Sequence, residues 1–573
     1  MNSIAYLREH IVTVIGEALE MGAEQLKNVT VTLNTDGPDV FGDFSCNAAM
    51  ILAKPLKTSP RQVAERIITT LKSAEIKGHQ NPISAHIKDV TIAGPGFVNI
   101  TLTPETWHTT AHELIAHPRH CFHLFPEGKK YNYLVEFVSA NPTGPLHLAH
   151  GRNAIIGDTL SKVLTFLGHK VTREFYINDA GSQIKKLGES LKARCFQAAG
   201  KEYSLPEGGY QGDYLIETAK KCFNKYGKAI IEKSDSFFAK HAKQEMFELI
   251  KKDLEIYGIS FDKWFSEETL HNNSSIEEII KQLTSKNLAY EKDGATWFKA
   301  TEYGDDKDRV LKKADGSYTY IAPDIAYHKT KFDRGFDKII DILGQDHHGY
   351  VQRLKGTMKA LGFDADKLEV ILYQLVRMKK GKAFVKMSKR SGAFESLSDV
   401  IKTVGRDVAR FFYLHRKADA HLEFDLDIAL KKSDANPVYY ILYAYVRTGS
   451  LLKKALDIKE LKANVTSLMN GSLDEANEAP HIHDINIDEI NLLKKICSLR
   501  SVLLTIANSY QTHLLSVYAY ELAKQFHSYY NGHQIINEDD IPQSKCRLML
   551  IVLVRNTLNL TLDLLGLSKP KKM

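Results

Sequence analysis

The chain has 573 residues, which is long for one hydrophobic core and predicts three or four domains. With 43% hydrophobic and 25% charged residues, the composition is that of an ordinary globular protein and excludes a disordered chain. The net charge of +7 permits an anionic partner such as RNA without requiring one. The six cysteines are scattered with no Cys-x-x-Cys pair, so we expect reduced thiols in a cytoplasmic protein.

The first predicted domain is a small α+β unit over residues 1–110. An amphipathic helix is expected over 1–28, helical patterns flank Phe41-Gly42-Asp43, and strands are expected within 86–100. The opening helix is too acidic for a transit peptide, and the apolar runs are too short for a membrane span. We therefore expect no membrane partner.

The second predicted domain, residues 125–430, is a Rossmann-like doubly wound parallel sheet. A nearly continuous apolar strand at 131–139 is followed by a loop, a helix from about Gly151 to Gly168, and a strand at 170–176. Apolar strands of this kind are buried on both faces, as in parallel sheets, and the order predicts a right-handed crossover. A Lys-, Glu- and Tyr-rich stretch at about 185–270 reads as a helical insertion, after which the strand pattern resumes at 338–343.

The third predicted domain, residues 436–573, is an all-α helical bundle. Helical patterns cover 438–456, 488–510, 514–530 and 543–566, and the polar stretch 458–487 is expected to be a linker or long loop. The chain is thus predicted to be a multidomain α/β protein. Its catalytic core would lie between an N-terminal α+β domain and a C-terminal helical domain.

Two tetrapeptides carry the chemistry. His147-Leu148-Ala149-His150 follows the first apolar strand, and Lys386-Met387-Ser388-Lys389 lies later in the same predicted domain. Alone, the first is more often a pair of ordinary loop histidines and the second a solvated basic loop. Together they suit a site where ATP loses pyrophosphate.

The physical reason lies in the charge that develops during attack on the α-phosphate. Imidazoles at a helix N-terminus and flexible ammonium groups stabilise phosphoryl oxygens as that charge grows. We therefore assign catalytic roles to His147, His150, Lys386 and Lys389. ATP is expected as a substrate complex with Mg²⁺, with no tightly bound cofactor and no dedicated metal site.

The run from Val135 to Arg152 resembles the signature of class I aminoacyl-tRNA synthetases, specifically the arginyl-tRNA synthetases. Further similar segments are Phe41–Asp43, Gly94–Phe97, Asp324–His328, Gly344–Tyr350, Lys386–Gly392, Asn436–Tyr440 and Leu564–Leu567. The resemblance implies that arginine and ATP form arginyl-adenylate, and that the arginyl group passes to the terminal 2′-hydroxyl of tRNA(Arg). It also implies a monomer, a first step that needs bound tRNA, an N-terminal domain contacting the tRNA corner, and a helical domain reading the anticodon.

The resemblance also implies the site residues. For ATP these are Gly144, His147, Ala149, His150, Gly151, Met387, Ser388 and Lys389. For arginine they are Glu136, Ser139, Asn141, His150, Tyr320, Asp324 and Gln345. A guanidinium prefers planar carboxylate partners, which fits Glu136 and Asp324. The alternatives stay open that Glu136 belongs to a structural ion pair and that Gln345 caps a loop.

Two departures from the family pattern stand out. Ala149 occupies a position that is usually glycine, so we expect its methyl group to weaken ATP binding or shift its pose without abolishing activity. Leu442 and Tyr445 replace two polar residues on a helix predicted to read the anticodon. Tyr445 could still stack on a splayed base, whereas a helical core stripe is the alternative for the neighbouring tyrosines.

Other interpretations remain possible at this point. A cluster with helical metal-ligand spacing is more typical of a polar linker than of a metal site: His108, His112, His117, His120, Cys121 and His123. The two tetrapeptides also fit a nucleotidylyl transferase, but the outer domains argue against it. A non-catalytic tRNA-binding relative is disfavoured by the retained histidines and lysines and weakly favoured by Ala149.

Overall fold

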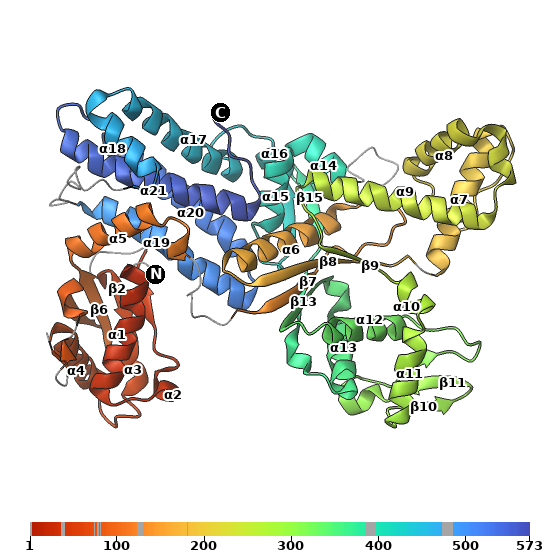
Figure 1. Cartoon of the computed structure of the whole chain (residues 1–573), viewed down its shortest axis with the longest axis horizontal. Helices are drawn as coiled ribbons and strands as arrows, with labels where there is room; N and C mark the ends of the chain where they lie inside the picture. Colours follow the sequence, from red (N-terminus) through yellow and green to blue (C-terminus); the bar gives the residue numbers. More distant parts are fainter. Residues whose placement is uncertain are drawn as a thin grey trace.

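The computed structural model describes residues 3–35, 41–73, 75–76, 79–80, 82–122, 130–179, 181–384, 396–472 and 485–573. Figure 1 shows a central sheet, with the N-terminal domain at the lower left and the C-terminal helices running above both. The helices α7 and α8 project at the far right, away from the N-terminal domain. The predicted fold class, a parallel-sheet core between an α+β domain and a helical domain, is confirmed.

The N-terminal domain packs helices on an antiparallel sheet of order β1–β2–β6–β5. The residues next to Phe41 form strands rather than the predicted helices, because buried Phe44 and Cys46 alternate with the more exposed Ser45. The expected helix over 1–28 is interrupted at Glu20, whose φ is +58°. The elements are α1 (Ser3–Leu19), α2 (Ala23–Leu26), β1 (Val31–Leu33), β2 (Phe44–Cys46), α3 (Ala48–Leu52), α4 (Pro60–Lys72), β3 (Glu75–Ile76), β4 (His79–Gln80), β5 (Ile87–Ala93), β6 (Phe97–Leu102) and α5 (Pro104–Ala116).

The catalytic core is a parallel sheet of order β14–β13–β7–β8–β9. From β7 the chain moves outward to β8 and β9, then returns to β13 and continues to β14, so the direction of winding reverses between β7 and β13. Ligands bind at such a switch point, beyond the carboxyl ends of the strands. The sheet elements are β7 (Asn132–Glu136), β8 (Lys170–Ile177), β9 (Lys263–Ser266), β13 (Lys338–Gly344) and β14 (Leu368–Tyr373).

Helices connect these strands on both faces. The crossover helix α6 (Leu148–Phe166) begins earlier than predicted, so both histidines of the first tetrapeptide lie at its start. The stretch expected to be a helical insertion contains α7 (Ser182–Ala198), α8 (Asp213–Tyr226) and α9 (Asp235–Ile256), but its end forms the edge strand β9. The following elements are α10 (Glu268–Asn272), α11 (Ser275–Ser285), β10 (Ala289–Lys292), β11 (Ala295–Phe298), β12 (Arg309–Lys312), α12 (Ile321–Asp333) and α13 (His348–Leu361).

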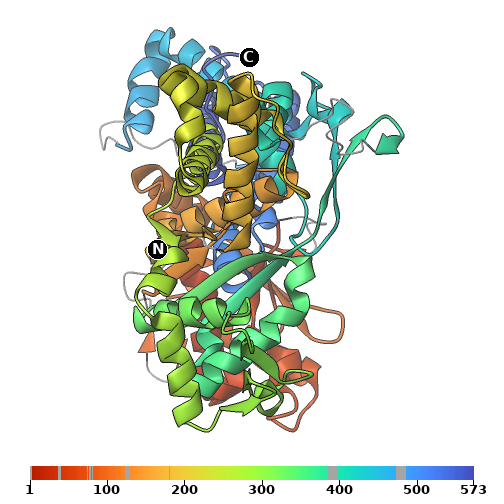
Figure 2. The ribbon, with the colours of Figure 1, turned by 90° about the vertical axis from the view of Figure 1, so that its right-hand side faces the viewer.

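A second, smaller sheet follows the core. Its strand β15 (Val376–Lys380) pairs with β16 (Ala383–Phe384) and β17 (Leu422–Asp425), and the β15–β16 hairpin stands out at the right of Figure 2. In the sequence, α14 (Leu397–Val404) and α15 (Arg406–Leu414) lie between β16 and β17, and α16 (Leu426–Ala429) follows β17.

The C-terminal domain is entirely helical among its described residues. The predicted loop 458–487 contains the helix α18, because Leu461, Val465 and Leu468 form an apolar face that is buried. The last helix, α21, is long and apolar enough to span a bilayer, but 78% of its most apolar window is buried, as in a core helix. The helices are α17 (Pro437–Leu456), α18 (Lys459–Met469), α19 (Ile487–Ser509), α20 (His513–Gly532) and α21 (Ile541–Leu565).

Candidate active site

A cavity of about 950 Å³ opens at the carboxyl ends of β7 and β13, at the switch point of the sheet. Most of the predicted site residues that the structure describes line it, although they come from distant parts of the sequence. These are Glu136, Ser139, Asn141, His147, Ala149, His150, Tyr320, Asp324 and Gln345. The predicted Gly144 and Gly151 are not among its lining residues.

The loop after β7 has a strained backbone. Val138 and Ser139 have φ angles of +68° and +44°, a region that a β-branched residue rarely adopts. Hydrogen bonds hold the loop there: Val138 N donates to Asn153 Oδ1 (2.7 Å), and Ser139 Oγ donates to Glu136 Oε1 (2.7 Å). Asn153 also donates to the Ile342 carbonyl on β13 (2.8 Å), so α6 clamps both strand ends. These hydrogen bonds offset the strain and hold the loop in place at the cavity.

The two histidines form the first turn of α6. His147 is the N-cap residue, its backbone N–H donates to His150 Nδ1 (3.2 Å), and the two rings stack with centroids 3.7 Å apart. Burial lowers the pKa of both side chains, to about 3 for His150, where neighbouring His147 adds to the effect. Both rings are therefore neutral near pH 7. At a helix N-terminus they can donate hydrogen bonds to phosphate oxygens, as the helix dipole also favours.

Gly144 and Gly151 lie against neighbouring side chains. A Cβ on Gly151 would lie 2.4 Å from Leu397 Cδ1 and 2.8 Å from Tyr413 Cζ, so only glycine lets α14 and α15 pack this closely on α6. A Cβ on Gly144 would lie 3.1 Å from Tyr214 Oη. These contacts account for both glycines by packing, and their predicted contact with ATP stays a prediction.

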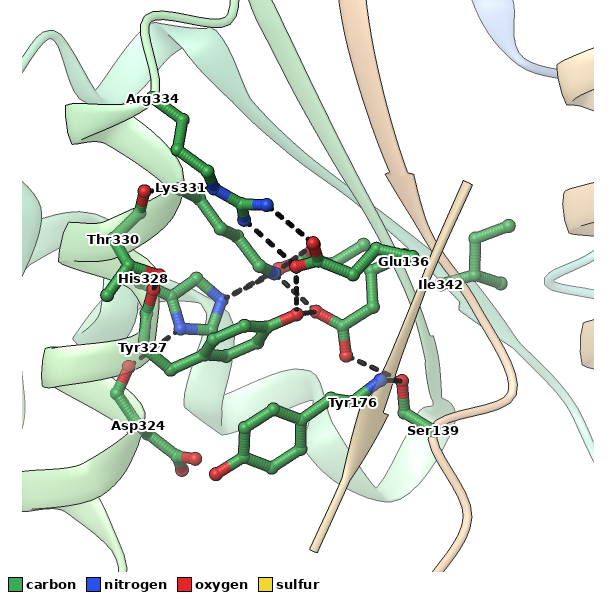
Figure 3. Close-up of polar contacts among 12 residues, drawn as sticks. Glu136, Ser139, Tyr176, Asp324, Tyr327, His328, Thr330, Lys331, Arg334 and Ile342 are labelled. Carbon is green, nitrogen blue, oxygen red and sulfur yellow. Dashed lines mark hydrogen bonds and ion pairs between the residues drawn. The ribbon is translucent and has the colours of Figure 1, made fainter. Parts of the chain in front are cut away.

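Beneath the cavity lies a buried network of charges, drawn in Figure 3. Lys331, fully buried on α12, pairs with Glu136 and with Asp341 Oδ1 (2.7 Å). Despite burial, which lowers it, the Asp341 and Glu136 carboxylates raise the pKa of Lys331. His328 Nε2 lies 2.8 Å from Asp341 Oδ2. This network supports the structural ion pair that sequence analysis kept as the alternative for Glu136.

The neighbouring β8 completes the network. Tyr327 Oη lies 2.8 Å from Glu136 Oε2 and 2.7 Å from Glu174 Oε1, and Arg334 Nη1 pairs with Glu174 Oε2 (2.5 Å). Sequence analysis named Tyr327 and His328 only as part of the similar segment Asp324–His328, gave them no role, and did not name Lys331 or Arg334. The sequence does contain a pattern that could have identified them. Tyr327, His328 and Lys331 follow Asp324 at spacings of three, four and seven residues, so they share one face of a helix with it.

Asp324 differs from Glu136 and Asp341, the two carboxylates of the cavity that pair with Lys331. Its carboxylate accepts a hydrogen bond from Tyr350 Oη, and among the residues that the structure describes no lysine or arginine pairs with it. The pKa of Asp324 is raised to about 6, mainly by burial and also by nearby Glu267 and Glu136, against the opposing effects of the Tyr350 hydrogen bond and His328. Such a carboxylate would be stabilised by a cationic ligand in the cavity.

Several predicted features lie elsewhere. Lys386, Met387, Ser388 and Lys389 lie outside the described residues, although Leu397 N, just beyond them, donates to the Leu146 carbonyl (2.7 Å) beside His147. His108 and His112 lie on α5 with ring centroids 4.1 Å apart, whereas His123 lies outside the described part. Across the described ranges, no group of three or more potential metal ligands was found.

Leu442 and Tyr445, the two residues of α17 that depart from the family pattern, are buried. Leu442 and Tyr445 are 8% and 7% exposed, and the Tyr445 ring packs under the Arg555 guanidinium with 4.4 Å to its centroid. This burial argues against stacking of Tyr445 on a base. Tyr443, on the same helix, is 40% exposed. The substitutions therefore change the core of the helical domain.

Three family models match successive parts of the chain. The family "tRNA synthetases class I (R), catalytic domain" matches residues 123–410. "Arginyl tRNA synthetase N terminal domain" matches residues 5–102, and "DALR anticodon binding domain" matches residues 441–573. The fold is also that of the Thermus thermophilus arginyl-tRNA synthetase, with a TM-score of 0.71 over 99% of this chain and 100% of that one at 18% identity.

Closer relatives share more of the sequence. The arginine–tRNA ligase of Desulforamulus reducens is 42% identical over 537 residues, which cover 93% of this chain and 92% of the relative. The arginine–tRNA ligase of Bacillus subtilis is 40% identical over 96% of each chain. The resemblance first seen in residues 135–152 thus extends over nearly the whole sequence, and the chain belongs to the arginine–tRNA ligase family of class I aminoacyl-tRNA synthetases.

Proposed function

We propose that the chain ligates L-arginine to tRNA(Arg) through an arginyl-adenylate, and that it works in protein synthesis as a cytoplasmic monomer. The observation that carries the choice of amino acid is the Asp324 carboxylate in the cavity. It is largely shielded from water, has a raised pKa, and lacks a described lysine or arginine partner. An arginine guanidinium supplies the missing cation with the planar geometry that a carboxylate prefers.

The proposed arginine site divides into two parts. Ser139, Asn141 and His150 contact the amino and carboxylate groups of the amino acid, while Tyr320, Asp324 and Gln345 contact its side chain. Glu136 lies behind these residues, held by Lys331 and Ser139, and adds negative charge to the cavity floor. A neutral analogue would leave Asp324 buried and unpaired, so selection needs no separate editing step.

The proposed ATP site lies at the start of α6. His147 and His150 donate to phosphate oxygens, and Ala149 packs against the adenine side of the nucleotide. Lys386 and Lys389 neutralise the departing β- and γ-phosphates, with Met387 and Ser388 between them contacting ATP. Gly144 and Gly151 support this region. Mg²⁺ enters with ATP as part of the substrate complex and takes few protein ligands.

The tRNA is proposed to contact all three parts of the chain. Residues 1–110 contact the corner of the tRNA, residues 125–430 hold its acceptor end at the cavity, and residues 436–573 read the anticodon. The helical insertion at about 185–270 belongs to the catalytic domain. Support comes from the matching family descriptions.

The decisive experiment is amino-acid-dependent ATP–pyrophosphate exchange, measured over all twenty amino acids with and without tRNA. We expect exchange with arginine alone, and only when tRNA is present. Exchange with another amino acid, or with none, contradicts the proposal. The second outcome would fit a non-catalytic relative, for which Ala149 was the weak indication.

The phosphate role of Lys389 can be tested separately. Lys389→Ala should reduce adenylate formation strongly while leaving arginine affinity unchanged, because the ammonium group acts on the leaving phosphates. Lys382→Ala removes the same charge from an exposed position on the neighbouring turn and serves as the matched control. Equal losses of adenylate formation and arginine affinity would show that Lys389 is only structural.

A further inference from the structure

Arg410 joins three elements from different parts of the chain. It lies on α15 and is 1% exposed. Its guanidinium donates to the Leu565 carbonyl at the end of α21 (2.9 Å) and to the Tyr257 carbonyl just after α9 (2.8 Å), and it pairs with Asp158 Oδ2 on α6 (2.5 Å). In Figure 1 these helices converge beside the central sheet.

Two of these contacts are with the C-terminal ends of helices. The last carbonyls of a helix have no partner within it and carry partial negative charge, which favours a cation. The contact with α21 is close: Gly566 has a φ of +68°, and a Cβ there would lie 2.4 Å from Arg410 Nη2. Arg406, one turn earlier, donates to the Gly566 carbonyl (3.1 Å). The end of α21 is therefore seated directly on the guanidinium groups of α15.

From Arg410 two routes lead to the first turn of α6. The direct route is the ion pair with Asp158, two turns after His150 on the same helix. Together with Lys162, Arg410 holds the pKa of Asp158 below its ordinary value despite the opposing effect of burial. The helix carrying both histidines is thus fixed to the residue that holds the end of α21.

The second route passes through Tyr257 and Leu397. Tyr257 Oη donates to the Leu397 carbonyl (3.2 Å), and Leu397 N donates to the Leu146 carbonyl (2.7 Å). Leu146 directly precedes His147. A continuous set of hydrogen bonds therefore runs from the end of the C-terminal domain to the residue before the catalytic motif.

We propose that Arg410 is a positioning residue that couples the seating of α21 to the first turn of α6, so that tRNA held by the helical domain changes the rate of adenylate formation. This inference rests on the proposed function, because tRNA is the ligand that the helical domain is proposed to bind. A buried ion pair is weak evidence for stability alone, since desolvation offsets much of its attraction. Coupling between two sites is shown only by measuring how one ligand changes the other.

The experiment measures ATP–pyrophosphate exchange in the full-length protein with and without tRNA, at varied arginine and ATP, and the stimulation by tRNA is the exchange rate at saturation with tRNA minus the rate without it. Arg410→Lys keeps the charge, but its single nitrogen cannot span the three partners that Nε, Nη1 and Nη2 reach separately. Gly566→Ala disturbs the same contact from the other side, since its Cβ displaces the guanidinium. Both variants should reduce the stimulation by tRNA about fivefold or more, a typical coupling, without changing the KM for arginine or ATP.

A matched control separates coupling from general stability. Arg547 is 9% exposed on α21, and its partners Glu489 and Gln534 lie within the helical domain. Arg547→Lys should lower the melting temperature and leave the stimulation by tRNA unchanged. Tyr257→Phe removes only the hydroxyl of the second route and should give a smaller loss of stimulation than Arg410→Lys.

The outcomes are distinct. An unchanged stimulation in Arg410→Lys and Gly566→Ala, or an equal loss in Arg547→Lys, overturns the coupling and leaves the proposed function standing. A wild-type protein without arginine-dependent exchange contradicts the proposed function instead. In that case the dissociation constant of ATP, measured by calorimetry with and without tRNA, still tests the coupling. An equal effect of tRNA in wild type and Arg410→Lys overturns it.

Discussion

The cavity and the Arg410 contacts each contain an aspartate, in opposite electrostatic settings: Asp324 is partly buried in the cavity wall, and Asp158 is buried in the core. Asp158 pairs with Arg410 and Lys162, which hold its pKa low. Asp324 has Tyr350 as its hydrogen-bond donor, and burial raises its pKa to about 6. A buried carboxylate with a protein cation fixes the fold, whereas one without a cation can select a ligand that brings one. Aspartate therefore stabilises the fold at Asp158 and is available to select a cationic ligand at Asp324.

The largest expected effect on activity comes from Asp324→Asn. We expect kcat/KM for arginine to fall by about 10⁴-fold, because the guanidinium loses its carboxylate partner in a buried site. Steady-state exchange at varied arginine concentration measures this loss. Asp346→Asn is the matched control, since its side chain lines the same cavity but is 84% exposed. A similar loss in both variants would show that general negative charge, rather than Asp324, selects arginine.

The same variant should be more stable than wild type. With a folded pKa above the ordinary 3.8, Asp324 makes stability fall as pH rises from about 4 to about 6, and the loss persists at pH 7. Replacing it with a neutral amide should therefore raise the free energy of unfolding at pH 7 by about 1–3 kcal/mol. Urea denaturation measures this change. A clear loss of stability would contradict the view that Asp324, unlike Asp158, destabilises the folded protein.

Asp158→Asn should show the opposite pattern. Removing one partner of a buried ion pair leaves the Arg410 charge uncompensated, which costs about 3 kcal/mol of unfolding free energy. The KM for arginine should stay close to that of wild type, because Asp158 does not line the cavity. Urea denaturation together with exchange kinetics measures both quantities. A stable variant with weakened arginine binding would reverse the roles assigned to the two aspartates.

The pH dependence of arginine binding sharpens the contrast. Below about pH 6 the Asp324 carboxylate becomes protonated, so arginine affinity should fall about tenfold per pH unit. Calorimetry between pH 5 and 8 would show this fall, with protons released on binding near pH 6. Asp324→Asn should bind weakly with no such dependence, whereas Asp158→Asn should retain it. An arginine affinity of the wild type that does not change between pH 5 and 8 would contradict the raised pKa of Asp324.

The smallest effect is expected at Ala149. Ala149→Gly removes the methyl group at the cavity wall, and we expect the KM for ATP to fall about tenfold or less. Ala149→Ser enlarges the same position and should raise that KM. Arginine affinity should not change in either variant. A raised KM for ATP in Ala149→Gly, or the same KM for ATP in both variants, would show that adenine does not pack against this residue.

The parallel sheet and most of the cavity lining could be predicted, because apolar strands and the loops after them are local patterns. The charge network could not be predicted, because β7 and β13 bring Glu136 beside Asp341 only through strand register. The face of α12 that carries Tyr327 and Lys331 was readable as helical spacing, but its partners were not. Glycine roles were missed for the same reason: Gly151 faces Leu397, which is remote in sequence.

The helical domain shows a second limit of prediction from the sequence, namely which face of a helix is buried. The apolar face of α18, formed by Leu461, Val465 and Leu468, was hidden by its polar surroundings. The substitutions at Leu442 and Tyr445 were interpreted as changes in an RNA-binding face, because sequence spacing does not show which face of a helix is buried. Long-range packing decided both cases.

The seating of α21 also has a consequence for how the protein is made. Arg410 and the Leu565 carbonyl are 155 residues apart, and α21 is synthesised after every other element that Arg410 contacts. Until that helix emerges from the ribosome, the guanidinium lacks one of its acceptors and the end of α21 that covers it. The nascent chain therefore completes the contacts of Arg410 only after α21 has been made, so the support that we propose for the first turn of α6 depends on the presence of the helical domain.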